Sequence, residues 1–201
     1  QFDKLYTEGL QIPSSIYLLD VNGNCTDAGG RGFSDGDPDV QIWPVLGSLK
    51  LTPWVGPGAA QVMGCLYELD GSPCEVDPRH VLKKVVERFH ASGLNPVVAL
   101  ELEFYLLDAS SAETNQPSPP VLPETGRQAT ATQVYSLADL DGFTGFLSEV
   151  ETICRIQDIP VGATTAEYAV GQYEINLNHV DDPLKAADDA ILLQRTTHQR
   201  E

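Results

Sequence analysis

Four glutamates in two short segments are the residues of this sequence whose type and spacing best suit chemistry. Glu101 and Glu103 lie two residues apart in the apolar run ALELEFYLLD, and Glu167 and Glu174 lie seven apart in AEYAVGQYEINL. Side chains at i and i+2 of a strand point to the same face, so the first two carboxylates should lie side by side. Carboxylates within apolar strands are costly unless a cation neutralises them. The pattern predicts a hard divalent metal, Mg²⁺ or Mn²⁺, held by oxygen ligands.

The second segment predicts a strand with one polar and one apolar face. Residues alternate in type from Tyr173 to Asn178. Because the strand period is two, Glu174 should share a face with Asn176 and Asn178. The opposite face would carry the apolar residues Tyr173, Ile175 and Leu177.

Composition limits the classes of function. The 201 residues are 42% hydrophobic and 20% charged, which suits a globular protein of one large or two small domains. The net charge of −17 disfavours nucleic-acid and anionic-membrane partners. The apolar runs fall far short of the ~20 residues of a membrane span, and no signal-peptide pattern opens the chain. Four dispersed cysteines without a CxxC motif favour reduced thiols and a cytoplasmic protein.

The sequence divides into two regions with different patterns. Residues 1–75 contain short β-segments separated by turns, for example 15–20 and 60–69, whereas residues 76–201 alternate helices with strands. The expected fold class is therefore α+β, with one domain in each region.

Helix signals in the second region frame the two glutamate segments. Asp77-Pro78 and Asp182-Pro183 each combine an N-cap acceptor with proline at the first helical position. Gly93 should end the first helix. The predicted apolar stripes are Val81, Leu82, Val85, Val86 and Phe89 in that first helix, Leu140 to Cys154 in the second, and Leu184, Ala187 and Ile191 in the third. The Pro-rich segment 109–133 should be a long exposed loop. Because the last helix is still running at Glu201, we expect a longer protein.

Other motifs carry no function. The DGDPD segment fails as an EF-hand because Val40 stands at its sixth position, where that loop needs glycine. The cluster at Gly29–Gly32 lacks the lysine of a P-loop. His80 and His90 should face solvent on the first helix.

In their order along the chain, these features resemble the glutamine synthetase family and its γ-glutamylpolyamine synthetase-like branch. The similarity extends over nearly all 201 residues. It implies a β-grasp-like N-terminal domain (1–75) followed by the first part of the family's catalytic domain (76–201). The matching segments are LDVNG (19–23), GDPD (36–39), TPW (52–54), DPRHVL (77–82), ELEFY (101–105), EY (167–168) and GQYEINL (171–177).

The resemblance implies roles for the glutamates. Glu103, Glu167 and Glu174 would hold a metal near the substrate glutamate, and Glu101 would help hold a second metal that bridges the phosphates of ATP. His179 would lie near the nucleotide. ATP would phosphorylate the γ-carboxyl of glutamate, and an amine or ammonia would displace phosphate from the γ-glutamyl phosphate. The downstream residues that complete the family's site lie outside this sequence, so the chain by itself should be inactive.

The resemblance also implies a site shared between subunits. An acidic residue of the N-terminal domain would bind and deprotonate the amine in the neighbouring subunit, and Asp35, Asp37 or Asp39 could serve, or these could form a turn without chemistry. Such sharing requires a ring-shaped homo-oligomer, a dodecamer by resemblance.

Two alternatives remain open. One is another acid–amine ligase with paired glutamates, such as a glutamate–cysteine ligase type. The other is a non-catalytic short form or pseudoenzyme that serves assembly or binding. The sequence does not discriminate among ammonia, polyamines and other amines as acceptor.

Overall fold

The computed structural model describes residues 2–130 and 133–198. The chain forms two compact units, Gln1–Thr52 with Pro57–Asn95, and Pro53–Gly56 with Pro96–Glu201. Each unit mixes helices and strands. In the described residues, no helix is both long and apolar enough to span a membrane.

The first unit is built on an antiparallel sheet in the order β1-β2-β5. Its strands are β1 (Leu10–Pro13), β2 (Asp39–Pro44) and β5 (Gly64–Tyr67). Val40, Leu66 and Cys74 form its buried core. The remaining elements are α1 (Phe2–Glu8), the two-stranded pair β3 (Lys50–Leu51) and β4 (Ala60–Gln61), the 3₁₀ turns η1 (Ser14–Leu18) and η2 (Phe33–Asp35), and α2 (Pro78–Ala91).

The β-segment expected at 15–20 is wrong, because η1 occupies most of it. Two tertiary hydrogen bonds fix this segment: Ser14 N–H donates to Pro38 O at 2.9 Å, and the Ser14 hydroxyl donates to Arg31 O at 3.2 Å. Local β-propensity is a weak preference that such contacts readily override.

Helix α2 begins and ends where the sequence predicts. The Asp77 carboxylate accepts from Arg79 N–H at 2.7 Å, and Gly93 past the helix end has φ +72°. The predicted buried face is wrong in part, because Val86 is buried but other members of the stripe are not. Three members of the stripe are exposed, and His80, expected in solvent, is buried with Val86; the exposed residues are Val81 (47%), Val85 (42%) and Phe89 (42%). His90 is exposed, as predicted.

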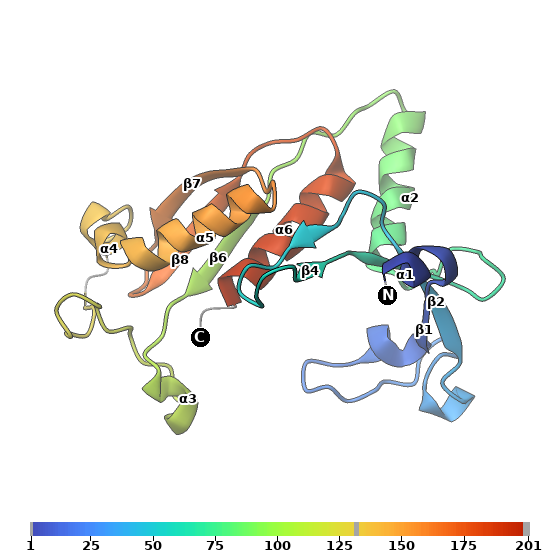
Figure 1. Cartoon of the computed structure of the whole chain (residues 1–201), viewed down its shortest axis with the longest axis horizontal. Helices are drawn as coiled ribbons and strands as arrows, with labels where there is room; N and C mark the ends of the chain where they lie inside the picture. Colours follow the sequence, from blue (N-terminus) through green and yellow to red (C-terminus); the bar gives the residue numbers. More distant parts are fainter. Residues whose placement is uncertain (1, 131–132, 199–201) are drawn as a thin grey trace. The chain divides into compact units, whose positions relative to one another are not determined.

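The second unit is built on an antiparallel sheet in the order β6-β8-β7. The strands are β6 (Glu101–Tyr105), β7 (Val161–Ala166) and β8 (Gln172–Leu177). Helices α5 (Thr144–Ile156) and α6 (Pro183–Thr197) contact each other and cover one face of this sheet, α5 against β7 and α6 against β6 (Figure 1). Tyr173, Ile175 and Leu177 of β8 are buried, as the alternation predicts.

Three expectations for this unit need correction. The helix predicted from Leu140 to Cys154 is divided into α4 (Leu137–Gly142) and α5, and Phe143 at the break packs its ring 5.8 Å from that of Tyr173. The expected loop 109–133 contains α3 (Ser110–Thr114); residues 131–132 lie outside the described part. The predicted stripe of α6 is wrong in part, since Ile191 is 53% exposed while the buried residues include Ala186, Leu192 and Leu193.

Candidate active site

Three of the four glutamates lie on the polar face of the β6-β8-β7 sheet, opposite the helices. Glu103 of β6 pairs directly with Glu174 of β8, and Glu101 pairs with Asn176. Glu167 follows β7 immediately, two residues after Thr165, which pairs with Glu174. Strand geometry therefore brings together Glu101, Glu103 and Glu174 on one face, with Glu167 at its end.

These carboxylates form an uncompensated patch of negative charge. Directly opposed side chains in antiparallel strands have Cβ atoms roughly 5 Å apart, and like charges at that separation repel. In the part of the chain that the structure describes, no Lys, Arg or His side chain forms an ion pair with any of the four. Glu101 and Glu103 are exposed, so the burial cost inferred from the apolar sequence does not apply to them; Glu167 and Glu174 are half-buried.

Neutral side chains hold three of the carboxylates. The amide of Gln172 donates to Glu103 Oε2 at 2.8 Å, and the amide of Asn176 donates to Glu174 Oε1 at 2.7 Å. The Thr165 hydroxyl donates to Glu167 Oε1 at 3.2 Å. Each bond fixes one carboxylate oxygen without neutralising the charge. The second oxygen of each group has no hydrogen-bond donor among residues 2–130 and 133–198.

A tight turn between β7 and β8 places Glu167. Glu167 N–H donates to Gln172 O at 2.9 Å, and Gln172 N–H donates to Ala169 O at 3.0 Å. Gly171 has φ +76°, a conformation that favours glycine. A Cβ there would lie 2.6 Å from Leu106 O, which is too close for any other residue without a backbone shift.

A hollow of about 550 Å³ lies at the end of the sheet next to Glu101. It is lined by Asn178 and His179, which follow β8, and by Gly162 and Ala163 of β7. The β7–β8 register shifts by one residue between Val161 and Thr164, so these two β7 residues form a bulge that shapes the wall. The structure thus places Glu101 and His179 on one hollow.

The donor set on this face suits a hard cation. Every charged group is a carboxylate, and Mg²⁺ and Mn²⁺ prefer such oxygen ligands. In the described residues, however, no three of the glutamates bring their oxygens within 4.8 Å of one another. Binding a cation would therefore need side-chain rotation, which exposure allows for Glu101 and Glu103.

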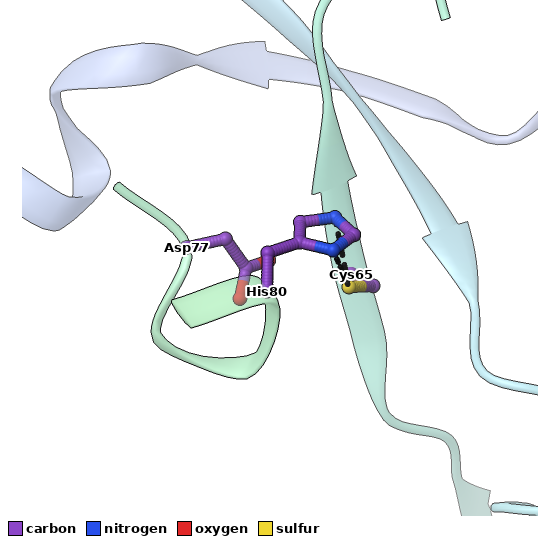
Figure 2. A group of neighbouring side chains, drawn as sticks. All are labelled: Cys65, Asp77 and His80. Atoms are coloured by element: carbon purple, nitrogen blue, oxygen red, sulfur yellow. Dashed lines mark hydrogen bonds between the residues drawn. The ribbon is translucent and has the colours of Figure 1, made fainter. Parts of the chain in front are cut away.

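The group that does meet this distance lies in the first unit and was missed from the sequence. Figure 2 shows the His80 ring at the start of α2 directed at the sulfur of Cys65 on β5, with Asp77 beside it. His80 Nε2 lies 3.3 Å from Cys65 Sγ and 2.8 Å from Leu66 O, so this nitrogen carries the proton. All three side chains are buried.

Hydrogen bonds already satisfy this group. Asp77 accepts from Arg79 N–H and from Leu66 N–H, each at 2.7 Å. Burial, with a smaller contribution from the Asp77 charge, raises the pKa of Cys65 to about 11. A metal would have to displace the proton of this thiol, and the raised pKa makes that displacement more costly. The Cys65, Asp77 and His80 group therefore fastens α2 to β5, with the ring of Tyr67 packed edge-on against His80.

Of the three aspartates predicted as candidates for amine binding, Asp35 and Asp37 hold backbone groups, and Asp39 is exposed at the start of β2. Asp35 Oδ2 accepts from Gly32 N–H, and Asp37 Oδ1 accepts from Ser15 N–H, each at 3.3 Å. Asp37 has φ +47° and Asp35 is exposed. These contacts fit the turn alternative, and the amine role stays a prediction.

Known proteins are similar to this chain in sequence and in fold. The family described as glutamine synthetase, catalytic domain, matches residues 75–200. The γ-glutamylputrescine synthetase PuuA of Escherichia coli (strain K12) is 38% identical over 192 residues, covering 96% of this chain and 41% of PuuA. The glutamate–isopropylamine ligase of a Pseudomonas species is 32% identical over 193 residues, with 96% and 41% covered.

A crystal structure of a novel glutamine synthase homolog superimposes with a TM-score of 0.78 at 23% identity, covering 98% of this chain and 42% of that one. At this identity the superposition supports the fold alone. The chain spans about two fifths of the length of the relatives that it matches. Because the catalytic-domain match covers more than half of its residues, the chain belongs to the glutamine synthetase family.

Proposed function

We propose that the complete protein is an ATP-dependent ligase that joins an amine or ammonia to the γ-carboxyl of glutamate through a γ-glutamyl phosphate. The observation that carries this proposal is the direct pairing of Glu103 with Glu174 on one face of the sheet, where no cationic side chain of the described residues compensates their charges. The family match and the ligase names of the relatives support the same reaction class.

The four glutamates would hold two Mg²⁺ or Mn²⁺ ions. Glu103, Glu167 and Glu174 would hold one cation near the substrate glutamate, and Glu101 would contribute to a second at the nucleotide. When bound, the cations would screen the repulsion between an attacking carboxylate and the phosphates of ATP. Hydrogen bonds from Gln172, Thr165 and Asn176 would hold one oxygen of each of these three carboxylates and leave the other oxygen available to a cation.

The hollow beside Glu101 is the proposed nucleotide end of the site. Asn178 and His179 on its wall offer polar groups that could form hydrogen bonds with an adenine or ribose. Glu101 lines the same hollow, so a cation at this carboxylate would meet the phosphates of a nucleotide bound there. ATP is therefore the proposed co-substrate.

The remaining parts of the proposal concern the complete protein. Residues 1–75 would form a β-grasp-like domain and 76–201 the first part of the catalytic domain. Asp35 or Asp37 would attract the cationic amine in the neighbouring subunit, within a ring-shaped homo-oligomer in the cytoplasm. Their present contacts leave each carboxylate with a second oxygen for this role.

A ligation assay with a panel of amines tests the reaction. The complete protein is incubated with glutamate, ATP, Mg²⁺ and, in separate reactions, ammonia, putrescine, spermidine, isopropylamine or methylamine. Phosphate release and the mass of the γ-glutamyl product are measured together. We expect one amine class to give stoichiometric product and phosphate, and Glu103→Gln to abolish both.

The matched control is Glu113→Gln, which makes the same change at an exposed position of α3. It should retain full ligation activity. Unchanged ligation in Glu103→Gln, or no product with any amine at saturating glutamate, would contradict the proposed function.

A further inference from the structure

We infer that Gln172 is a positioning residue that orients Glu103 for cation binding and couples it to the turn that carries Glu167. This inference rests on the proposed function, because it assigns Gln172 a task only if Glu103 binds a cation. Gln172 would not touch the cation or substrate itself. Its amide would act through the carboxylate of Glu103.

The geometry assigns the two ends of the Gln172 amide to different partners. Nε2 donates to Glu103 Oε2 at 2.8 Å across the β6–β8 pair, and Oε1 accepts from Ala169 N–H at 3.0 Å within the turn. The Gln172 backbone adds bonds to Ala169 O and from Glu167 N–H. Gln172 therefore links β6, the β7–β8 turn and the backbone N–H of Glu167.

Glu103 needs such a partner more than its neighbours do. It is an exposed side chain on β6, which is an outer strand of the sheet, so several rotamers are open to it. Glu174 and Glu167 are half-buried, and each is held by a residue two positions away on its own segment. Glu103 is held by a residue from another strand. Its orientation therefore depends on the β7–β8 turn being closed.

A neutral amide suits this task better than a cationic side chain. Lysine or arginine at position 172 would bond Glu103 but would also cancel the charge that attracts the cation. An amide donor restricts the carboxylate and preserves its full charge. Groups that orient metal-binding side chains in this way typically contribute roughly 10- to 100-fold in metal affinity or activity.

The competing explanation is that Gln172 only closes the turn. In that case, its loss would loosen Glu167 and the sheet irrespective of Glu103. A double-mutant cycle separates the two, because a residue that acts through Glu103 has no effect on cation binding once Glu103 is removed.

The experiment measures the Mn²⁺ affinity of the complete protein by electron paramagnetic resonance, which detects free Mn²⁺ without turnover. The four proteins are the unaltered chain, Gln172→Met, Glu103→Gln and the double variant. We expect Gln172→Met to weaken Mn²⁺ binding by roughly tenfold, within the range for such groups. In the Glu103→Gln background, the same substitution should change the affinity by less than about twofold.

Gln116→Met serves as the matched control, since Gln116 is exposed and, among the described residues, its side chain forms no hydrogen bond with the glutamates. It should leave Mn²⁺ affinity unchanged. Gln172→Asn, which keeps an amide on a shorter arm, replaces Gln172→Met if the latter does not fold. It should show the same loss, because the shorter arm cannot span Glu103 and Ala169 together.

The outcomes distinguish this inference from the proposed function. If Glu103→Gln weakens Mn²⁺ binding but Gln172→Met does not, the inference is wrong and the proposed function stands. An equal loss from Gln172→Met in both backgrounds also refutes the inference, since it indicates a turn-closing role alone. If Glu103→Gln itself leaves Mn²⁺ affinity unchanged, the proposed cation site fails.

Discussion

Replacing Asp77 by alanine should destabilise the first unit more than a helix cap alone would explain. The Asp77 carboxylate makes two different bonds. Oδ1 caps α2 through Arg79 N–H, and Oδ2 accepts from Leu66 N–H on β5, both at 2.7 Å. Leu66 is only 3% exposed and Asp77 only 1%, so water does not replace the carboxylate without a rearrangement.

The magnitude follows from these two bonds. Loss of an N-cap aspartate costs about 0.5–2 kcal/mol. Leaving the buried Leu66 N–H without an acceptor costs about 1–3 kcal/mol. We therefore expect Asp77→Ala to lower the free energy of unfolding of the first unit by roughly 1.5–5 kcal/mol, if the two contributions add.

Asp182→Ala is the matched control, since it also removes an aspartate before a helix-starting proline. Asp182 is exposed, and among the described residues its carboxylate accepts only from Leu184 N–H and Lys185 N–H within α6. The cap alone is lost, so the cost should be roughly 0.5–2 kcal/mol. The difference between the two losses of unfolding free energy measures the contribution of the hydrogen bond from Leu66 N–H of β5 to Asp77.

Urea unfolding followed by tryptophan fluorescence makes the comparison. Trp43 lies on β2 opposite Cys65 and reports the first unit, whereas Trp54 belongs to the second. Asp77→Ala is measured with Trp54→Phe, and Asp182→Ala with Trp43→Phe, each against its own single-tryptophan parent. Because the units need not unfold together, each transition is fitted separately. A cost for Asp77→Ala no larger than that for Asp182→Ala would refute the reasoning.

Two further predictions concern the second unit. Gly171→Ala should destabilise it by about 1–3 kcal/mol, because alanine would need φ +76° and would place Cβ 2.6 Å from Leu106 O. The control is Gly145→Ala in α5, which has open space at its Cβ and should leave stability unchanged or raise it in chemical denaturation. Equal effects of the two substitutions would contradict the strain assigned to the turn. Burial raises the pKa of Cys154 from 9.0 to about 12, so the unfolded thiol loses its proton first and stability should fall as the pH rises from about 9 to 12. Cys154→Ala should show a shallower alkaline decline in urea midpoint, and an identical decline would exclude this thiol as a cause.

The polar face of the second sheet could be predicted from the sequence because strand alternation is a local property. Glu101 with Glu103, and Glu174 with Asn176, lie on the faces that a period of two assigns. The two Asp-Pro helix starts are also confirmed, since the cap and the proline act on neighbouring backbone atoms. These features could be predicted because each depends only on residues close together in the sequence.

Features set by tertiary contacts could not be predicted in this way. The buried faces of α2 and α6 depend on where each helix lies, and an apolar residue such as Val81 or Ile191 can remain exposed. His80 was predicted to face solvent, but it is buried, and Leu66 O of β5 accepts a hydrogen bond from its ring. The bonds from Gln172 to Glu103 and from Thr165 to Glu167 likewise depend on strand register, although Gln172 stands within the segment that the sequence singled out.

The most direct test of the central claim is a Mn²⁺ titration of the complete protein, comparing the unaltered chain with Glu174→Gln and the exposed control Glu113→Gln. If the paired glutamates bind a cation, Glu174→Gln should weaken Mn²⁺ binding by at least roughly tenfold while Glu113→Gln leaves it unchanged. An identical titration for all three proteins would show that the carboxylate facing Glu103 is no cation ligand.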